Sequence, residues 1–254
     1  MASNLSGHSM TPDQIERYKR HFLVKEIGGP GQQKLLNSHV MIVGAGALGG
    51  VAARILTATG IGRITVFDKD RVELSNLQRQ TQFSKRDVGD TKVGALFRSL
   101  STLNADTQID AVQDRWTSET GLPEVDLILD GSDNFETRFA LNAASRAEGI
   151  PLISGAVAGW TGQVLAVNDP SEASCPCYQC FVPAEPPDAG NCKDLGVVGA
   201  ITHLVASHQA LLATRYLIGE QKNLFGRLTI MDGLGGAFRT VKLPQDPSCP
   251  VCNP

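Results

Sequence analysis

Short apolar runs alternate with segments of helical periodicity through the first two thirds of the chain. The runs that predict strands lie at Val40–Val43, Arg63–Phe67, Thr107–Val112, Val125–Leu129, Pro151–Ser154 and Gly162–Val167. The segments that predict helices lie at Pro12–Val24, from the glycines after Val43 to about Thr59, at Lys92–Leu103 and at Phe135–Glu148. Strands that alternate with helices indicate an α/β fold, with a Rossmann-like, doubly wound and mostly parallel sheet.

Two segments interrupt this alternation. Gly28-Gly29-Pro30-Gly31 predicts a turn, because glycine and proline both disfavour regular structure. Between Asn168 and Asn191 no periodicity is evident, and Pro, Cys and Asp are frequent, which indicates a loop or a small subdomain. A long helix at about Ile201–Gly219 follows. Strands at Arg227–Met231 and Arg239–Leu243 are expected to complete the sheet.

Composition narrows the class of protein. The 254 residues are 42% hydrophobic and 19% charged, as in ordinary globular proteins, with a formal net charge of −3. This balance argues against a partner that is nucleic acid or a membrane surface, since both usually require a basic excess. The polar segment Met1–Gln14 does not resemble a signal peptide, and no apolar run reaches the roughly 18 residues of a membrane span. We therefore expect a cytoplasmic protein.

A glycine motif, Gly44-x-Gly46-x-x-Gly49, lies between a predicted strand and a predicted helix. Gly44 permits a tight turn, Gly46 lets a phosphate approach the backbone, and Gly49 lets the helix pack closely on the strand. Asp68 ends the next strand, about 20 residues on, where an acid can bind ribose hydroxyls. Alternatively, the glycines only allow helix and strand to pack. The strand, the spacing and the acid together favour a nucleotide.

Two cations follow this motif in polar surroundings. Arg79 lies in the polar stretch Val72–Gln80, and guanidinium groups bind phosphate oxygens in pairs. Lys92 lies at the start of a predicted helix, where a cation is unfavourable to the helix dipole unless an anion is near. The alternative is that both are solvated surface residues. Together with the glycine motif they favour a phosphate-rich ligand.

A third strand end carries acidic residues. Asp130-Gly131-Ser132-Asp133-Asn134 follows the strand at Val125–Leu129. A carboxylate there can hold Mg²⁺, which binds one or two carboxylates together with substrate phosphates. The alternative is an Asp or Asn cap for the helix that starts near Phe135, and Asp133 or Asn134 can serve in both ways.

The six cysteines indicate a metal site, because cytoplasmic thiols are kept reduced. Two Cys-x-x-Cys pairs, Cys177/Cys180 and Cys249/Cys252, match the ligand spacing of a structural zinc site with four thiolates. The alternative is four unrelated thiols. Outside the pairs, Cys192 precedes Lys193, a cation that can lower a thiol pKa, so Cys192 is a candidate nucleophile.

These motifs occur together in a known family. They are the glycine motif, Ser75-Asn76-Leu77-Gln78-Arg79-Gln80, Lys92, Ser132-Asp133-Asn134, the cysteine pairs, and Asn191-Cys192 ahead of Gly196-Val197-Val198-Gly199. The chain, from about Arg17 to its end, closely resembles the adenylyltransferases of molybdopterin and thiamine biosynthesis. These enzymes are bacterial relatives of ubiquitin-activating enzymes. The resemblance implies ATP-dependent activation of the C-terminal carboxylate of a small ubiquitin-like sulfur-carrier protein that ends in Gly-Gly.

The resemblance also implies roles for single residues. The nucleotide site that it implies comprises Gly44, Gly46, Ala47, Gly49, Asp68, Ser75, Asn76, Arg79, Lys92, Asp133 and Asn134, with Mg²⁺ at Asp133 and structural zinc on the four paired cysteines. Arg20 resembles the arginine that reaches the nucleotide of the other subunit, which implies a homodimer. Cys192 matches a position where some members carry a reactive cysteine. Many relatives have glycine where Ala47 stands, and a residue this small is expected to preserve nucleotide binding.

The predicted organisation is therefore a disordered lead, 1–11, and a single adenylyltransferase domain, 12–254. Its nucleotide-binding half is expected at about 12–167 and an appended part that binds zinc and the partner at about 168–254. A NAD-dependent oxidoreductase explains the glycine motif and Asp68 but leaves Arg79, Lys92 and the cysteine pairs unexplained. The motifs are also compatible with a non-catalytic subunit, and with a related enzyme that adenylates a small molecule, a tRNA or a peptide.

Overall fold

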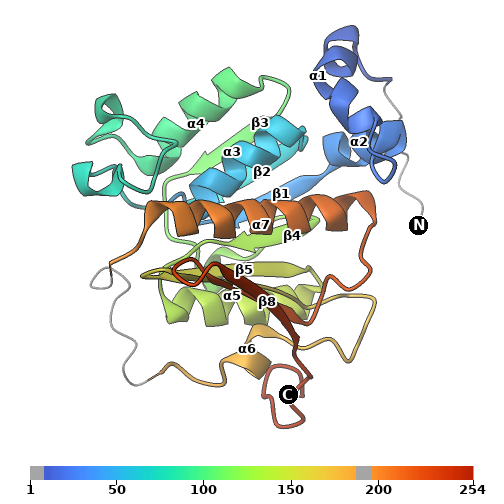
Figure 1. The fold of residues 1–254 in the computed structure, drawn as a ribbon, viewed down its shortest axis with the longest axis vertical. Coiled ribbons are helices and arrows are strands. Elements are labelled where there is room, and N and C mark those ends of the chain that lie inside the picture. The colour runs from blue at the N-terminus through green and yellow to red at the C-terminus, as the bar shows by residue number, and fades with distance from the viewer. Residues whose placement is uncertain (1–8, 187–195, 254) are drawn as a thin grey trace.

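A single eight-stranded sheet forms the centre of the protein. The computed structural model describes residues 9–186 and 196–253 (Figure 1). The strands are β1 (His39–Val43), β2 (Arg63–Phe67), β3 (Gln108–Val112), β4 (Leu127–Asp130), β5 (Leu152–Ala158), β6 (Thr161–Val167), β7 (Arg227–Asp232) and β8 (Ala237–Lys242). Their order is β3-β2-β1-β4-β5-β6-β7-β8. The pairings from β3 to β5 are parallel, and those from β5 to β8 are antiparallel.

Helices cover both faces of this sheet. They are α1 (Pro12–Phe22), α2 (Gly28–Asn37), α3 (Gly49–Thr59), α4 (Lys92–Leu103), α5 (Phe135–Glu148), α6 (Tyr178–Phe181) and α7 (Gly199–Ile218), with 3-10 turns at Leu74–Asn76, Lys85–Asp87 and Ser118–Thr120. Helices α3, α4 and α7 lie over one face and α5 over the other (Figure 1). The fold is thus a three-layer, Rossmann-like α/β structure, as the alternation of elements predicts.

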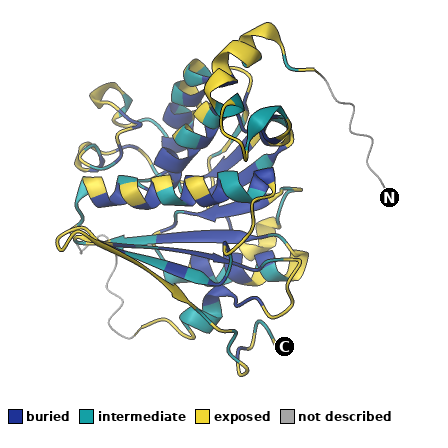
Figure 2. Cartoon of the chain, turned by 45° about the vertical axis from the view of Figure 1, so that its right-hand side comes forward, coloured by how far each residue is buried: buried dark blue, intermediate teal, exposed yellow. Residues whose placement is uncertain are grey.

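Alternating side chains of the central strands build two separate cores. On β1, Val40 and Ile42 face the core under α3 and α7, whereas Met41 and Val43 face the core under α5. This division follows from the two-residue period of a strand. Because both faces are covered, the central strands are the most deeply buried part of the molecule (Figure 2).

The topology places three loops at one edge of the sheet. Strands β1, β2 and β4 are parallel neighbours, so Gly44, Asp68 and Gly131, which follow them, emerge side by side. The chain runs outward from β1 through β2 to β3 and then returns to place β4 on the other side of β1. Ligands of open α/β sheets bind in the crevice at such a switch point, beyond the carboxyl ends of the strands.

The prediction of a turn at 28–31 is wrong, because α2 begins at Gly28. Pro30 lies in the first helical turn, where the backbone N–H groups lack helical partners in any case, so proline does not interrupt the helix. Burial of Gly31 and Leu35 provides the stabilisation that local propensity lacks. The other predicted elements are confirmed, most with ends shifted by one or two residues. Helix α1 is capped by Thr11, whose side chain accepts from the N–H of Gln14.

The C-terminal strands extend the same sheet. β7 pairs with β6 and β8 pairs with β7, so much of the predicted appended part is continuous with the central layer. The division of the chain into two functional parts remains a prediction. Residues 1–8 of the predicted lead lie outside the described part of the chain. Within the described residues, every helix is too short or too polar to cross a membrane.

Candidate active site and metal centre

A cavity of about 480 Å³ lies at the carboxyl edge of the parallel strands. The nucleotide residues expected from the sequence that line it are Gly44, Gly46, Ala47, Asp68, Ser75, Asn76, Arg79, Lys92 and Asp133. The structure adds the charged residues Asp70, Arg71, Glu73 and Arg138, together with Gln80 and Ser132. Acidic and basic groups thus meet in one recess. Such a combination suits a polyphosphate that is bound together with a divalent cation.

The glycine turn has the geometry that its sequence predicts. Gly44 has a φ of 97°, and a Cβ there would lie 2.7 Å from the carbonyl oxygen of Gly131. A Cβ on Gly49 would overlap the carbonyl oxygen of Gly44, so only glycine lets α3 start against the end of β1. Gly49 itself does not line the cavity. Its contribution is the close packing that brings the start of α3 to the cavity.

Gln82 holds the same turn from within the protein, and sequence reasoning missed it. Its amide nitrogen donates to the carbonyl oxygens of Ala45 and Gly46, each at 3.0 Å. Gly50 makes room for this side chain, because a Cβ there would clash with the Gln82 amide. The only sequence signal is a polar residue that follows the Ser75–Gln80 motif. The turn is therefore shaped before any ligand binds.

Asp68 is fixed at the end of β2 by two backbone groups. Its carboxylate accepts from the N–H of Ala45 at 2.7 Å and from the N–H of Asp70 at 2.8 Å. Burial raises the pKa of Asp68 above its ordinary value, and the nearby Lys92 and the two backbone bonds oppose that rise. The position agrees with the predicted ribose contact, which remains a prediction.

Lys92 is a buried cation, not a solvated one. Only 7% of the residue is exposed, and its ammonium group lies 3.1 Å from the carboxylate of Asp70. Thr91 caps α4 by accepting from the N–H of Gly94, which leaves the Lys92 side chain to project into the cavity wall. A buried ammonium group at this point provides positive potential for an anionic ligand.

The loop after β2 brings Asn76 and Arg79 to the cavity. Asn76 lies in the 3-10 turn and accepts from the N–H of Glu73 at 3.2 Å, which orders the loop. Arg79 donates to the carbonyl oxygen of Ser75 at 3.1 Å. The guanidinium group is therefore oriented by its own loop and is only partly exposed.

The structure separates the two roles that the sequence left open at the end of β4. The side chain of Asn134 accepts from the N–H of Thr137 at 2.9 Å and caps α5. Asp133 lines the main cavity, whereas Asn134 does not. A second cavity, of about 140 Å³, is bounded by both of them and by Trp116. It shares Gly44, Asp68, Asp70, Ser132 and Asp133 with the first cavity, so the two cavities adjoin.

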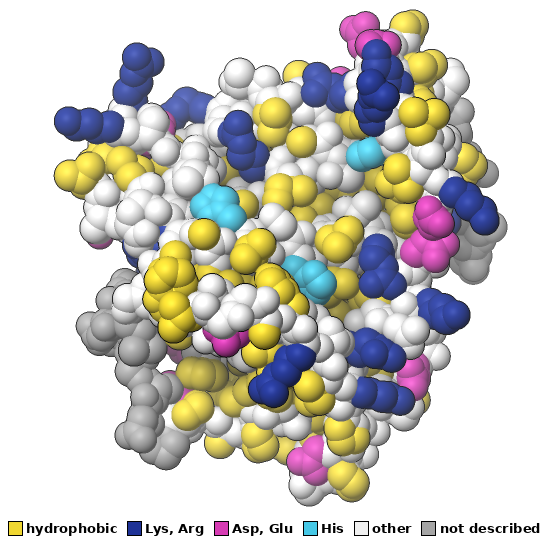
Figure 3. Space-filling view, in the orientation of Figure 1, with side chains coloured by type: hydrophobic (Ala, Val, Ile, Leu, Met, Phe, Trp, Pro, Cys, Tyr) yellow, Lys and Arg dark blue, Asp and Glu magenta, His cyan; other side chains and the backbone are white. Residues whose placement is uncertain are grey.

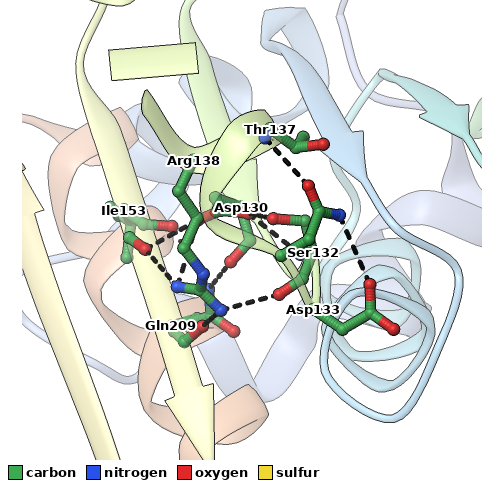
Figure 4. Close-up of polar contacts among 10 residues, drawn as sticks. Asp130, Ser132, Asp133, Thr137, Arg138, Ile153 and Gln209 are labelled. Carbon is green, nitrogen blue, oxygen red and sulfur yellow. Dashed lines mark hydrogen bonds and ion pairs between the residues drawn. The ribbon is translucent and has the colours of Figure 1, made fainter. Parts of the chain in front are cut away.

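A buried ion pair supports this edge from below, and sequence reasoning missed it as well. Arg138 of α5 lies 3.4 Å from the carboxylate of Asp130 and donates to the side chain of Ser154 at 3.0 Å (Figure 4). It also donates to the carbonyl oxygens of Ser132 and Gly155, at 2.6 and 2.9 Å. An arginine on the apolar face of a predicted helix, one turn after Asn134, is the signal that could have revealed it. The pair joins α5 to the ends of β4 and β5.

The two cysteine pairs meet, as their spacing predicts. The Sγ atoms of Cys177 and Cys249 are 3.5 Å apart, those of Cys180 and Cys252 are 3.6 Å apart, and all four lie within 4.8 Å of one another. Sulfur atoms about 2.3 Å from a central ion in tetrahedral geometry are separated by about 3.8 Å. The four thiols therefore fit a tetrahedral metal ion. Cys175 is also buried but is not part of this cluster.

Asn142 links the cysteine cluster to α5. This fully buried residue accepts from the N–H of Tyr178 at 2.7 Å, next to Cys177. Burial raises the pKa of the Cys177 thiol, and the Asn142 side chain acts in the opposite direction. The helix that starts beside Asp133 thus also supports the metal centre. Helix α5 runs between the two sites and connects them structurally.

The roles predicted for Arg20 and Cys192 stay predictions. Arg20 is exposed on α1 and does not line the cavity of its own chain, so the role implied for it in a second subunit remains a prediction. Cys192 lies outside the described residues.

Curated relatives cover nearly the whole chain. The sulfur carrier protein adenylyltransferase of Thermus thermophilus is 37% identical over 249 residues, which span 95% of this chain and 92% of that protein. The SAMP-activating enzyme E1 of Haloferax volcanii is 39% identical, over 96% of this chain and 91% of that one. The sulfur carrier protein ThiS adenylyltransferase of Escherichia coli is 38% identical, over 96% of this chain and 97% of that protein.

Solved structures and a family model complete the comparison. Escherichia coli MccB, solved with ATP, superposes with a TM-score of 0.81 over 94% of this chain and 75% of that one. At 22% identity this likeness concerns the fold alone. The model of the ThiF family matches residues 18–251, which contain the glycine turn, the cavity and three of the four clustered cysteines. The chain belongs to the ThiF family.

Proposed function

We propose that the protein is an ATP-dependent adenylyltransferase that activates the C-terminal glycine carboxylate of a small ubiquitin-like sulfur-carrier protein. The observation that carries this proposal is the cavity at the strand ends, where a glycine turn faces Arg79, Lys92 and Asp133. Relatives that share more than a third of their sequence with this chain are named as adenylyltransferases of sulfur-carrier proteins. The same fold in MccB has been solved with ATP.

In this proposal ATP lies across the two adjoining cavities. The phosphates occupy the main cavity, over the glycine turn at the start of α3, where unpaired N–H groups favour an anion. Asp68 binds the ribose at the boundary between the two cavities. The base extends toward the smaller cavity beside Trp116. Arg79 and Lys92 neutralise the charge of the phosphate oxygens, and the Asn76 amide donates a hydrogen bond to them.

The reaction needs positioning more than proton transfer. The carboxylate of the carrier protein attacks the α-phosphorus, a bond forms between carboxylate oxygen and phosphorus, and pyrophosphate leaves with the bonding electrons. An acyl-adenylate remains. The carboxylate is already ionised at neutral pH, so no side chain acts as a base. Arg79 and Lys92 stabilise the charge that develops on the leaving pyrophosphate. A bound Mg²⁺, held by Asp133 and the phosphates, would supply further neutralisation of that charge.

The carrier protein reaches this centre past an apolar wall. Ala156, Val157 and Val197 line the cavity together with its charged residues. An extended Gly-Gly tail has no side chains beyond its backbone, so it can lie close against this wall. The wall belongs to β5 and to the segment ahead of α7, so the strand end and that segment together define the entry.

The four clustered cysteines hold structural zinc in this proposal. A shell of four thiolates has no open position for a substrate, so the ion has no catalytic role. It joins the segment after β8 to the segment around α6. The protein acts in the cytoplasm, where thiols stay reduced. It acts as a homodimer in which Arg20 of one chain reaches the nucleotide of the other. Chromatography with light scattering tests the dimer.

The function is tested by ATP–pyrophosphate exchange with purified protein, Mg²⁺ and candidate carrier proteins that end in Gly-Gly. Exchange that depends on one carrier supports the proposal and identifies the sulfur-delivery pathway, whether molybdopterin, thiamine or another. ATP binding without exchange for any carrier would contradict the choice of substrate and point to a small molecule, tRNA or peptide, or to a silent subunit. Absence of ATP binding would overturn the proposal, and nicotinamide absorbance would indicate an oxidoreductase.

A further inference from the structure

Gln80 is a buried glutamine in the wall of the nucleotide cavity. Only 4% of the residue is exposed, and it lies among the residues that line the cavity. Its backbone is well fixed, because its N–H donates to the carbonyl oxygen of Asn76 at 2.9 Å and its own carbonyl accepts from Phe83 at 3.1 Å. The main chain of Gln80 is therefore fixed at the cavity wall.

The amide of Gln80 has no protein partner among the described residues. Its oxygen is buried without a hydrogen bond, as are those of Gln82 and Gln209, and its nitrogen makes none. The two other buried glutamines of this region differ in their nitrogens. Gln82 donates to the carbonyls of the glycine turn, and Gln209 donates to the carbonyl oxygens of Asp130 and Ile153. Their amides support the fold, whereas the Gln80 amide supports no other part of the chain.

The amide nitrogen of Gln80 faces the place that Gly46 leaves open. If Gly46 carried a Cβ, the nearest heavy atom outside its own turn would be this nitrogen, at 3.6 Å. Gly46 lacks a side chain at the position where a phosphate approaches the backbone of a glycine motif. The space above Gly46 is therefore bordered on one side by an unpaired N–H donor.

Burial of an amide without a partner destabilises a protein, so such groups usually serve a ligand. A phosphate oxygen is the matching acceptor for the amide nitrogen, and its charge strengthens the hydrogen bond. The amide oxygen is itself an acceptor and gains no bond from the phosphate. The Gln80 amide nitrogen can donate to a ligand only if that ligand occupies the space over Gly46, so the bond depends on the geometry of the glycine turn.

We infer that Gln80 is a nucleotide-binding residue whose amide N–H donates to the phosphate oxygen of ATP that lies over Gly46. This inference rests on the proposed function, because it requires ATP in the cavity. Arg79 and Lys92 attract the phosphates by their positive charge, whereas Gln80 is neutral and donates one directional hydrogen bond. It recognises the phosphate chain and leaves the base and the ribose to other residues.

The test compares Gln80→Met and Gln80→Glu with Gln78→Met. Methionine keeps the length and shape of the side chain and removes both amide groups. Glutamate replaces the donor by a negative charge that repels phosphate. Gln78 lies two residues earlier in the same loop, is exposed and does not line the cavity, so it is the matched control. The measurements are the Kd of ATP and the Kd of adenosine, by competition with a fluorescent ATP analogue, and the Tm of the ligand-free protein.

We expect Gln80→Met to weaken ATP binding about 10-fold or more, as for the loss of one hydrogen bond to a charged group. Gln80→Glu should weaken it further, and neither variant should change adenosine binding. The Tm of ligand-free Gln80→Met should be unchanged or raised, because a buried unpaired amide is removed. Gln78→Met should match the wild type throughout.

Three results would overturn the inference. One is wild-type ATP affinity in both Gln80 variants. Another is an equal loss of adenosine and ATP affinity. The third is a Tm of Gln80→Met that falls by several degrees, since this would show a structural role. If the wild-type protein binds no ATP, the proposed function itself fails. If it binds ATP and the variants bind equally well, only the role of Gln80 fails.

Discussion

The nucleotide cavity and the cysteine cluster are held in shape by different means. The glycine turn is clamped by Gln82, and the strand ends below it are joined by the Asp130–Arg138 pair. In the cluster, the segment with Cys249 and Cys252 meets the segment around α6 through the four sulfur atoms and two hydrogen bonds. These bonds run from Gln245 to the carbonyl oxygen of Ala173 and from the backbone of Asp246 to Cys180. The hydrogen bond from the N–H of Cys249 to Asp246 shapes its own turn only.

This difference indicates which interactions make each region rigid. The parallel strands and their buried polar contacts preorganise the cavity, so it needs no ligand to form. The cluster gathers four thiols whose pairwise separations suit an ion, and burial raises the pKa of Cys177 and Cys180. Its rigidity should therefore depend on the metal. The view of the α7 side shows acidic and basic side chains scattered without one dominant patch (Figure 3).

The largest expected effect tests the preorganised region. Arg138→Met leaves Asp130 buried without its cation, and loss of one partner of a buried ion pair costs about 3–5 kcal/mol. Urea unfolding of the ligand-free protein measures this loss. The double variant Asp130→Asn/Arg138→Met should recover part of it, since no unpaired charge remains. A loss below about 1 kcal/mol for Arg138→Met would show that the strand ends do not need this pair.

The next effect separates ligand contacts from support of the fold. Arg79→Ala and Asp133→Ala should each lower carrier-dependent ATP–pyrophosphate exchange about 10²- to 10³-fold, which corresponds to about 3–4 kcal/mol. Stability should remain close to that of the wild type, because neither side chain has a buried protein partner. Arg86→Ala, an exposed arginine of the same loop region, is the control. Substantial exchange in both variants would contradict the assigned roles.

The third effect tests the dependence of the cluster on metal. Cys252→Ser should lower the zinc content to well below one ion per chain and lower the free energy of unfolding by about 3 kcal/mol, the scale of linkage to a tightly bound ligand. Elemental analysis and thermal melts measure both quantities. Cys175→Ala alters a buried thiol outside the cluster and should keep its zinc. Chelation of the wild type should reproduce the loss of stability. Unchanged stability after complete removal of zinc would contradict the proposed structural role.

The smallest effect concerns Lys92 and depends on pH. Burial raises the pKa of Asp68 in the folded protein, so the unfolded chain loses the proton first and stability falls as pH rises between the two pKa values. Lys92 lowers the pKa of Asp68 and limits that fall. Lys92→Met should therefore be about 1 kcal/mol less stable at pH 7, a small value because Asp70 is well exposed. Urea unfolding at a series of pH values measures the free energy of unfolding of both proteins, and the two values should converge below about pH 3.9. If the difference in the free energy of unfolding between Lys92→Met and the wild type does not depend on pH, the loss of stability comes from packing and not from the charge of Lys92.

Local patterns predicted much of the fold and part of the site. Helices α4 and α5 begin and end at the predicted residues because their caps and periodicity are local. The prediction at 28–31 was wrong because burial of Gly31 and Leu35, a tertiary effect, outweighed the local preference of glycine for turns.

The sequence by itself determined the elements whose cause lies within a few residues. Examples are the glycine turn, the polar loop with Arg79 and the two cysteine pairs, whose spacing limits where each ligand can point. Only the tertiary structure decided which distant groups meet. It brought Asp70 to Lys92, Arg138 to Asp130 and the unpaired amide of Gln80 to the space over Gly46. The physical reason is that such contacts depend on strand order and on the packing of helices across the sheet. The spacing of residues along the chain determines neither of these.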